Sequence, residues 1–132
     1  MLFYRVEHKT KVNESIPTVN VGPYACTKLA KLLTDDMYEP EIHPTPDSDP
    51  LLRDFWETCW RKSNYVFGFA SLTSLHAWFF SEVGKRLADE EGLGRIGIYQ
   101  VADEHFHKGQ FQAIALASEL TLIETKPCVF RE

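Results

Sequence analysis

The sequence has no apolar run long enough to cross a membrane as a helix, and its first residues lack the apolar core of a signal peptide. Repeats, low-complexity tracts and a domain linker are also missing. The 132 residues, of which 44% are hydrophobic, suffice for one core, so we expect a single domain over residues 1–132. Together these features predict a soluble, cytoplasmic protein.

Cysteine is scarce: the chain has only Cys26, Cys59 and Cys128, and no two of them are close in sequence. This odd, scattered set is neither a disulfide framework nor a zinc ribbon, and reduced thiols are typical of a cytoplasmic protein. Cys59 lies on an apolar helix stripe, which favours packing over a role as nucleophile.

Positive charge is in deficit, since 14 lysines and arginines face 19 aspartates and glutamates and the net charge is −5. Direct, non-specific nucleic-acid binding needs basic surface to replace counterions, so we do not expect it. An acidic protein is instead attracted to the basic surfaces of a partner. The motifs of α/β-hydrolases, P-loop proteins and zinc metalloproteases are absent as well.

Apolar periodicity predicts a mixture of strands and helices. Strands are expected at 2–6, 65–70, 95–102, 111–117 and 120–125, and helices at about 25–37, 50–62 and 72–90. The last two strands are expected to form a hairpin around Ser118 and Glu119. Strands clustered after a helix favour an α+β domain with mixed or antiparallel sheets and two or three flanking helices.

Capping residues and glycines mark several expected boundaries. Asp49 is placed to cap a helix that begins at Pro50, and Gly92 is suited to end the helix over 72–90. Gly68 lies inside a strand, where a glycine often marks the close approach of another backbone or a ligand. The helix over 72–90 carries one apolar stripe, expected to pack on the sheet: Leu72, Leu75, Phe79, Val83 and Leu87.

Polar residues near three expected strands each have two interpretations. Arg5 either pairs with Glu7 or another acid, or offers its planar fork of donors to a ligand. Ser71 is either a helix N-cap or part of a ligand site at the strand-to-helix junction. Gln110 and Gln112 share a strand face, which is either the solvent face or a surface that hydrogen-bonds a ligand.

Histidines offer weaker candidates. His105 and His107 would share a strand face, and with Asp103 they form a metal-ligand hypothesis. A polar turn explains the same residues, so no metal site is predicted. His43 lies in a proline-rich segment and is interpreted first as a loop residue.

The pieces "FYRVEH", "GPY", "FGFASLTSL" and "GQFQAI" follow one another along the chain. In this order they resemble the ADP-ribosyltransferase fold, and most of the chain also resembles a group of small phage-type proteins in which an "HP" piece recurs. The resemblance implies an ADP-ribosyltransferase-like cleft that binds NAD. The cofactor-binding residues that it implies are Arg5, Tyr24, His43, Phe69 and Ser71.

The resemblance also implies that Gln112, with Gln110 beside it, stands where the family has its catalytic glutamate. A neutral amide does not stabilise a developing oxocarbenium cation as a carboxylate does. The sequence therefore departs from the family's pattern at the reacting centre. Glu119 and Glu124 follow at a different spacing.

Two main functional hypotheses follow. The first is a small phage-type ADP-ribosyltransferase-like protein that binds NAD or an ADP-ribose-like nucleotide and transfers ADP-ribose to a host protein. The second is a non-catalytic acidic phage or mobile-element protein that inhibits a host defence complex by direct protein binding in the host cytoplasm. Its expected contact faces are Glu39, Glu41, Asp47 and Asp49, and the "ADEEG" stretch at 88–92. A structural or oligomeric role is a third hypothesis, and the oligomeric state is left open.

Overall fold

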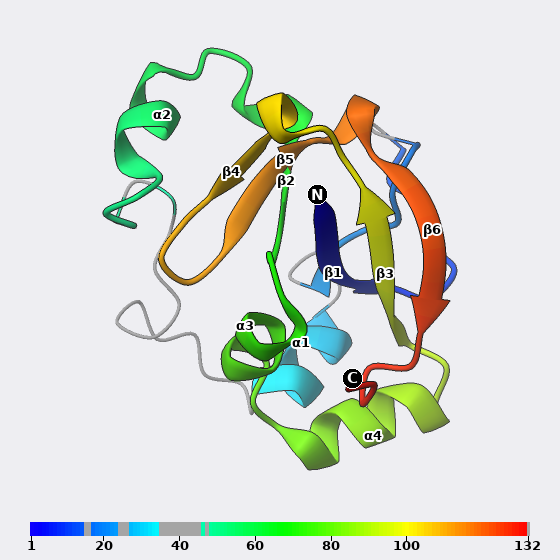
Figure 1. Cartoon of the computed structure of the whole chain (residues 1–132). Helices are drawn as coiled ribbons and strands as arrows, with labels where there is room; N and C mark the ends of the chain where they lie inside the picture. The colour runs from blue at the N-terminus through cyan, green and yellow to red at the C-terminus, as the bar shows by residue number, and fades with distance from the viewer. Residues whose placement is uncertain (15–16, 24–26, 35–45, 47, 132) are drawn as a thin grey trace.

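The computed structural model describes residues 1–14, 17–23, 27–34, 46 and 48–131 (Figure 1). Its strands are β1 (Leu2–His8), β2 (Tyr65–Gly68), β3 (Gly94–Gln100), β4 (Phe106–Lys108), β5 (Ala113–Leu116) and β6 (Thr121–Lys126). Its helices are α1 (Thr27–Thr34), α2 (Arg53–Thr58), α3 (Leu72–Trp78) and α4 (Glu82–Glu90). None of the described helices is long and apolar enough to cross a membrane.

The strands form two antiparallel sheets of three strands each, in the orders β1-β3-β6 and β2-β5-β4. The sheets meet where Tyr4 and Phe69 exchange backbone hydrogen bonds, with N–O distances of 2.8 and 2.7 Å. Figure 1 shows the sheets side by side, with α1, α3 and α4 gathered at one end and α2 at the opposite corner. This arrangement confirms a single α+β domain with antiparallel sheets.

Two hydrophobic cores lie on opposite faces of the β1-β3-β6 sheet because successive side chains of a strand point to opposite faces. Tyr4 and Val6 contribute to the core that faces α1, α3 and α4. Phe3 and Tyr99 contribute to the core between the two sheets. The expectation of one core is therefore wrong: β1 and β3 are covered on both faces.

Gly68 lies in β2 where β1 comes closest. A Cβ added there would lie 2.5 Å from the Phe3 ring and 2.6 Å from the Tyr4 carbonyl oxygen, so only glycine fits. The glycine in this strand thus marks the close approach of a neighbouring strand, as one of its two interpretations proposed.

The single helix predicted over 72–90 is two helices in the structure. The α3 helix ends at Trp78, and Ser81 caps α4 by accepting a hydrogen bond from the Gly84 backbone amide at 3.0 Å. A Cβ on Gly84 would lie 1.4 Å from the Leu32 carbonyl oxygen, so α4 turns this face toward α1. The predicted stripe splits as a result: its first three members are buried, whereas Val83 is 61% and Leu87 41% exposed. Gly92 does follow the end of α4, with a φ of 66°.

The predicted hairpin between the last two strands is wrong. β5 pairs with β2 and β4, whereas β6 pairs with β3 in the other sheet. A turn of 3-10 helix over Ala117–Glu119 carries the chain from one sheet to the other. β4 lies in a segment where no strand was firmly predicted, and β5 is shorter than the strand expected at 111–117.

The helix expected over 50–62 is also shorter, because α2 covers only Arg53–Thr58 and Leu52 occupies its N-cap position. Asp49 is fully buried and acts as a local anchor. Its carboxylate accepts hydrogen bonds from the backbone amides of Leu51 and Gln110, each at 3.0 Å. Cys59 follows α2 and is half-buried. The described part of the helix expected at 25–37 is α1.

Candidate functional site

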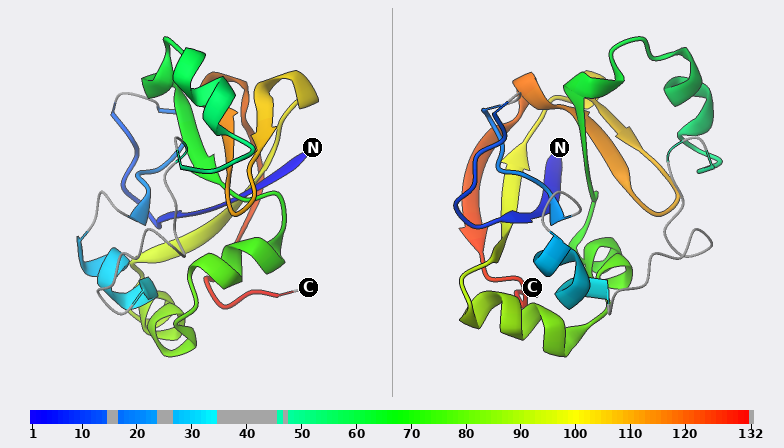
Figure 2. Two further views of the ribbon diagram at one scale, coloured as in Figure 1. Left: turned by 90° about the vertical axis from the view of Figure 1, so that its left-hand side faces the viewer. Right: turned by 180° about the vertical axis from the view of Figure 1, so that it is seen from behind.

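A cavity of about 300 Å³ lies between β2 and the segment that follows β1. The two segments face each other in the view from behind (Figure 2, right). Aromatic side chains form much of its wall: Tyr65, Phe67, Phe69, Trp78 and Phe79. Its polar side chains include Arg5, Asn13, Ser63 and Gln112. A mostly apolar hollow with a few polar groups is typical of small-molecule sites.

Arg5 is part of this wall, but its guanidinium is held by the protein. Nε donates to the Glu7 carboxylate at 3.3 Å, Nη1 to the Phe67 carbonyl at 2.8 Å and Nη2 to the Asn20 carbonyl at 3.1 Å. Burial lowers the pKa of Arg5, and the nearby Glu7 carboxylate acts in the opposite direction. Arg5 thus pairs with Glu7 inside the protein, and it ties β2 and the loop at Asn20 to β1.

The two glutamines predicted to share a strand face both precede β5. Gln112 is buried and lines the cavity. The Gln110 side chain is exposed, and its backbone amide donates to Asp49. The structure therefore brings Gln112, and not Gln110, together with Arg5 and Phe69.

Ser71 is the N-cap of α3, where its hydroxyl oxygen accepts a hydrogen bond from the Ser74 backbone amide at 3.1 Å. This confirms the capping interpretation. Ser71 lines a different hollow, which it shares with His76 and Arg131. Tyr24 and His43 lie outside the described residues, as do Glu39, Glu41 and Asp47 of the proposed acidic face.

No aspartate or glutamate lines the cavity among the residues that the structure describes. Glu7 is two residues from Arg5, which lines the cavity, but its carboxylate is fully buried in a polar network. The Tyr99 hydroxyl donates to it at 2.9 Å, and Arg95 Nε donates to it at 2.8 Å. Burial raises the pKa of Tyr99, and the Glu7 carboxylate raises it further. The described part of the cavity wall therefore offers no carboxylate of the kind that stabilises an oxocarbenium cation.

The histidine hypothesis finds no support in the described geometry, where no group of three or more metal-binding side chains occurs. His107 instead stacks on Phe55, with ring centres 3.7 Å apart and planes 22° apart. Burial lowers the pKa of His107, and His105 adds to this effect. His107 therefore makes an aromatic contact, which the spacing of the sequence did not indicate.

Sequence reasoning missed the network of Glu7, Arg95 and Tyr99. Its trace in the sequence is the alternation of "YRVEH", where two charged residues take every second position of an otherwise apolar strand. The same alternation is typical of a strand with one solvent face. In the structure both faces of β1 are buried, so its charges are paired inside the protein. Gly97 provides the space: a Cβ there would lie 2.7 Å from Glu7 Oε1.

The fold and the site together define a small α+β protein with an apolar, aromatic-lined cavity whose described lining residues include no carboxylate. The family model described as bacteriophage T4 Y00F protein matches residues 1–129, and the chain belongs to this family. No curated protein and no solved structure matches it. The match confirms the resemblance to phage proteins and gives no link to ADP-ribosyltransferases.

Proposed function

We propose that this phage protein acts by binding, and that its cavity takes up a planar, uncharged ring such as the nicotinamide or adenine of NAD. The observation that carries the proposal is the combination of aromatic walls and amide groups in one cavity of about 300 Å³. Phe67 and Phe69 offer ring faces or edges for stacking. Gln112 lines the cavity, and its amide carries both a donor and an acceptor, as does the hydrogen-bonding edge of a base or carboxamide.

Binding is favoured over ADP-ribose transfer for two reasons. The described cavity wall has no carboxylate, and a neutral Gln112 does not replace one. In addition, each of the three Arg5 nitrogens already donates to a protein oxygen, which uses three of the five N–H donors that a pyrophosphate would need. We therefore expect the ring to supply most of the affinity, and NAD to remain intact when it is incubated with the protein.

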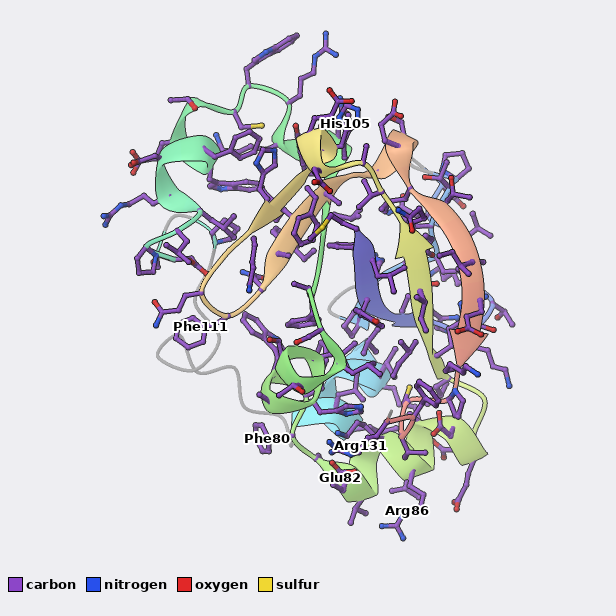
Figure 3. The ribbon with its side chains drawn as sticks, in the orientation of Figure 1. Phe80, Glu82, Arg86, His105, Phe111 and Arg131 are labelled. Atoms are coloured by element: carbon purple, nitrogen blue, oxygen red, sulfur yellow. The ribbon has the colours of Figure 1, made fainter. Side chains whose placement is uncertain are left out.

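The experiment compares nicotinamide, adenosine and NAD as ligands in thermal-shift and calorimetric titrations. At least one of them should raise the melting temperature, because a ligand that binds only the folded state stabilises it. Phe67→Ala removes an aromatic wall residue that is 43% exposed, and it should weaken binding. Phe111→Ala is the matched control, since Phe111 is 38% exposed, lies outside the cavity wall and is at the β4–β5 turn (Figure 3).

Two results would contradict the proposal. One is the absence of any shift with all three ligands at millimolar concentration. The other is an equal loss of binding in Phe67→Ala and Phe111→Ala. Release of free nicotinamide from NAD by the wild-type protein would show that it is catalytic after all.

A second candidate function is the binding of a host protein, favoured by the surface around α2. This helix contains no buried residue, and Figure 1 shows it at a corner of the molecule. Trp60, just beyond its end, is 81% exposed, and the Arg61 guanidinium carbon lies 4.1 Å from the centre of its ring. Tryptophan and arginine are enriched at the centres of protein interfaces. The net charge of −5 favours a partner with a basic surface.

Affinity capture from host lysate at low and high salt tests this candidate. A partner held by the wild type and by Phe111→Ala, lost by Trp60→Ala and released by salt, is the expected result. A partner held equally by the Trp60 variant would place the interface elsewhere.

A further inference from the structure

A further hollow, of about 410 Å³, lies at one end of the β1-β3-β6 sheet, and it shares no described lining residue with the hollow that Ser71 lines. The strands are antiparallel, so β1 ends where β3 begins: His8 is opposite Gly94. At the same edge β6 ends, with Lys126 opposite Ile96. Residues from three strand ends therefore meet in one place, and none of the described residues that line this hollow lines the cavity.

The hollow concentrates positive charge on a protein whose net charge is −5. Lys9, Arg95 and Lys126 line it, and Asp89 is the single acidic residue among its described lining residues. The Asp89 carboxylate already accepts hydrogen bonds from two backbone amides, at 2.6 and 3.2 Å. The hollow is thus a basic site on an acidic molecule.

Arg95 is held rigidly at this site by the buried network. Its Nε and Nη2 both lie 2.8 Å from Oε1 of Glu7. Glu7 is in turn fixed by the Tyr99 hydroxyl and by Arg5. The Arg95 side chain is still 21% exposed, and Nη1 has no partner among the described contacts. A guanidinium fixed on one edge and open on the other is preorganised to bind an anion.

The other hydrogen-bond donors of the hollow differ in whether they already contact other residues of the protein. Lys9 is exposed and forms no ion pair with any described residue, while its backbone amide is fixed by the Leu93 carbonyl at 3.0 Å. Lys126 lies 3.6 Å from Glu124 and 4.8 Å from the centre of the Phe130 ring, so it is partly engaged. The hydroxyl-bearing residues Thr10 and Thr125 also line the hollow.

We propose that this basic hollow binds a phosphate group of a ligand larger than phosphate itself. Arg95 supplies a fixed fork, Lys9 a mobile point charge and the threonines neutral donors, so donors of different geometry surround one volume. Such a set matches a tetrahedral oxyanion better than a planar carboxylate. The proposal is independent of the ring-binding cavity, because the two sites share no described lining residue.

The test is calorimetric titration at low ionic strength with pyrophosphate, inorganic phosphate and acetate. Pyrophosphate should bind, phosphate more weakly, and acetate least. Lys9→Ala should weaken pyrophosphate binding about tenfold, which is the usual scale for a charge-assisted hydrogen bond. Lys11→Ala is the matched control, because Lys11 is also exposed, lies two residues away and is not among the residues that line the hollow.

Arg95→Lys provides a second variant that keeps the charge and removes the fork. It should weaken pyrophosphate binding while the protein still unfolds cooperatively in urea. The proposal is overturned if the wild type binds no phosphate compound, if acetate competes as well as pyrophosphate, or if Lys9→Ala and Lys11→Ala have the same effect.

Discussion

The cavity and the basic hollow lie at the two ends of one buried network. The cavity is lined mostly by aromatic and other apolar residues, whereas the lining of the hollow includes three positively charged residues. Arg5 lines the cavity, Arg95 lines the hollow, and the Glu7 carboxylate joins the two guanidinium groups. At the cavity all three Arg5 nitrogens donate to the protein, whereas the described contacts of Arg95 use only two of its nitrogens. The same residue type is therefore structural at one end and available for recognition at the other.

The difference follows from position in the sheet. Arg5 is opposite Gly97 in the middle of β1, where the Phe67 and Asn20 carbonyls come within hydrogen-bond distance. Arg95 is opposite Glu7 close to the end of the pair, and its side chain is 21% exposed. An arginine in a strand is thus a ligand candidate only if its outer edge stays exposed.

The largest expected effect is that of Glu7→Ala, which breaks the link between the two sites. Breaking a buried ion pair leaves an uncompensated charge and costs about 3–5 kcal/mol. Here Arg5 would lose its carboxylate partner and Tyr99 its acceptor. Urea unfolding should show this loss, with Glu124→Ala on the exposed face of β6 as a control that stays within about 0.5 kcal/mol of the wild type. A Glu7 variant as stable as this control would show that the network is not holding the sheet.

An intermediate effect is expected for Ser71→Ala, which sharpens the comparison by testing a residue that the structure places outside both sites. Loss of the cap on α3 should cost about 0.5–2 kcal/mol in urea unfolding. The affinities for nicotinamide and pyrophosphate should not change. A Ser71 variant that loses ligand binding without losing stability would return this residue to the ligand site.

Alternation and capping patterns predicted much of the fold. β1 and β3 appear where alternating or continuous apolar runs predicted them, because a strand buried on both faces leaves a clear trace in sequence. The break between α3 and α4 was missed, although Ser81 is a good cap, because the apolar stripe continues through it. Its cause is tertiary: Gly84 packs against the Leu32 carbonyl, a contact that no local pattern contains.

The candidate site was predicted only in part, again because contacts between distant segments leave no local pattern in the sequence. Arg5, Phe69 and Gln112 do meet at one cavity, but the hydrogen bonds of Arg5 depend on carbonyl groups far away in sequence. The basic hollow was not predicted at all, because Lys9, Arg95 and Lys126 come together only through the strand order β1-β3-β6. The sheet assignment of β6, which sequence reasoning placed in a hairpin with β5, decides whether Lys126 reaches this site.

The smallest expected effect concerns pH. The buried Lys85 ammonium lies 2.7 Å from His76 Nδ1, and His76 Nε2 lies 2.7 Å from the Phe130 carbonyl. An ammonium group only donates, so Nδ1 accepts and the folded protein holds His76 neutral. Burial is the main cause that lowers the pKa of His76, and the charges of Lys85 and Arg131 lower it further; Glu82, which pairs with Arg131 (Figure 3), and the Phe130 carbonyl oppose this.

Because the unfolded chain binds this proton more readily, stability should decline as pH falls below about 6.5, the ordinary histidine value. Urea unfolding at about pH 7.5 and about pH 5.5 measures this decline. His76→Gln should flatten the pH dependence, and His107→Gln should also reduce it, because the pKa of His107 is lowered as well. An unchanged slope in the His76 variant would contradict the assignment.

The most direct measurement is nuclear magnetic resonance of the backbone amides during separate titrations with nicotinamide or adenosine and with pyrophosphate. The ring compound should shift the amides of Phe67, Phe69 and Gln112 at the cavity. Pyrophosphate should shift those of Lys9, Gly94 and Arg95 at the hollow. Two separate sets of shifts would support two sites, one that binds an uncharged ring and one that binds a phosphate group. Shifts by the ring compound that leave the cavity amides unchanged, or one set common to both ligands, would contradict the account.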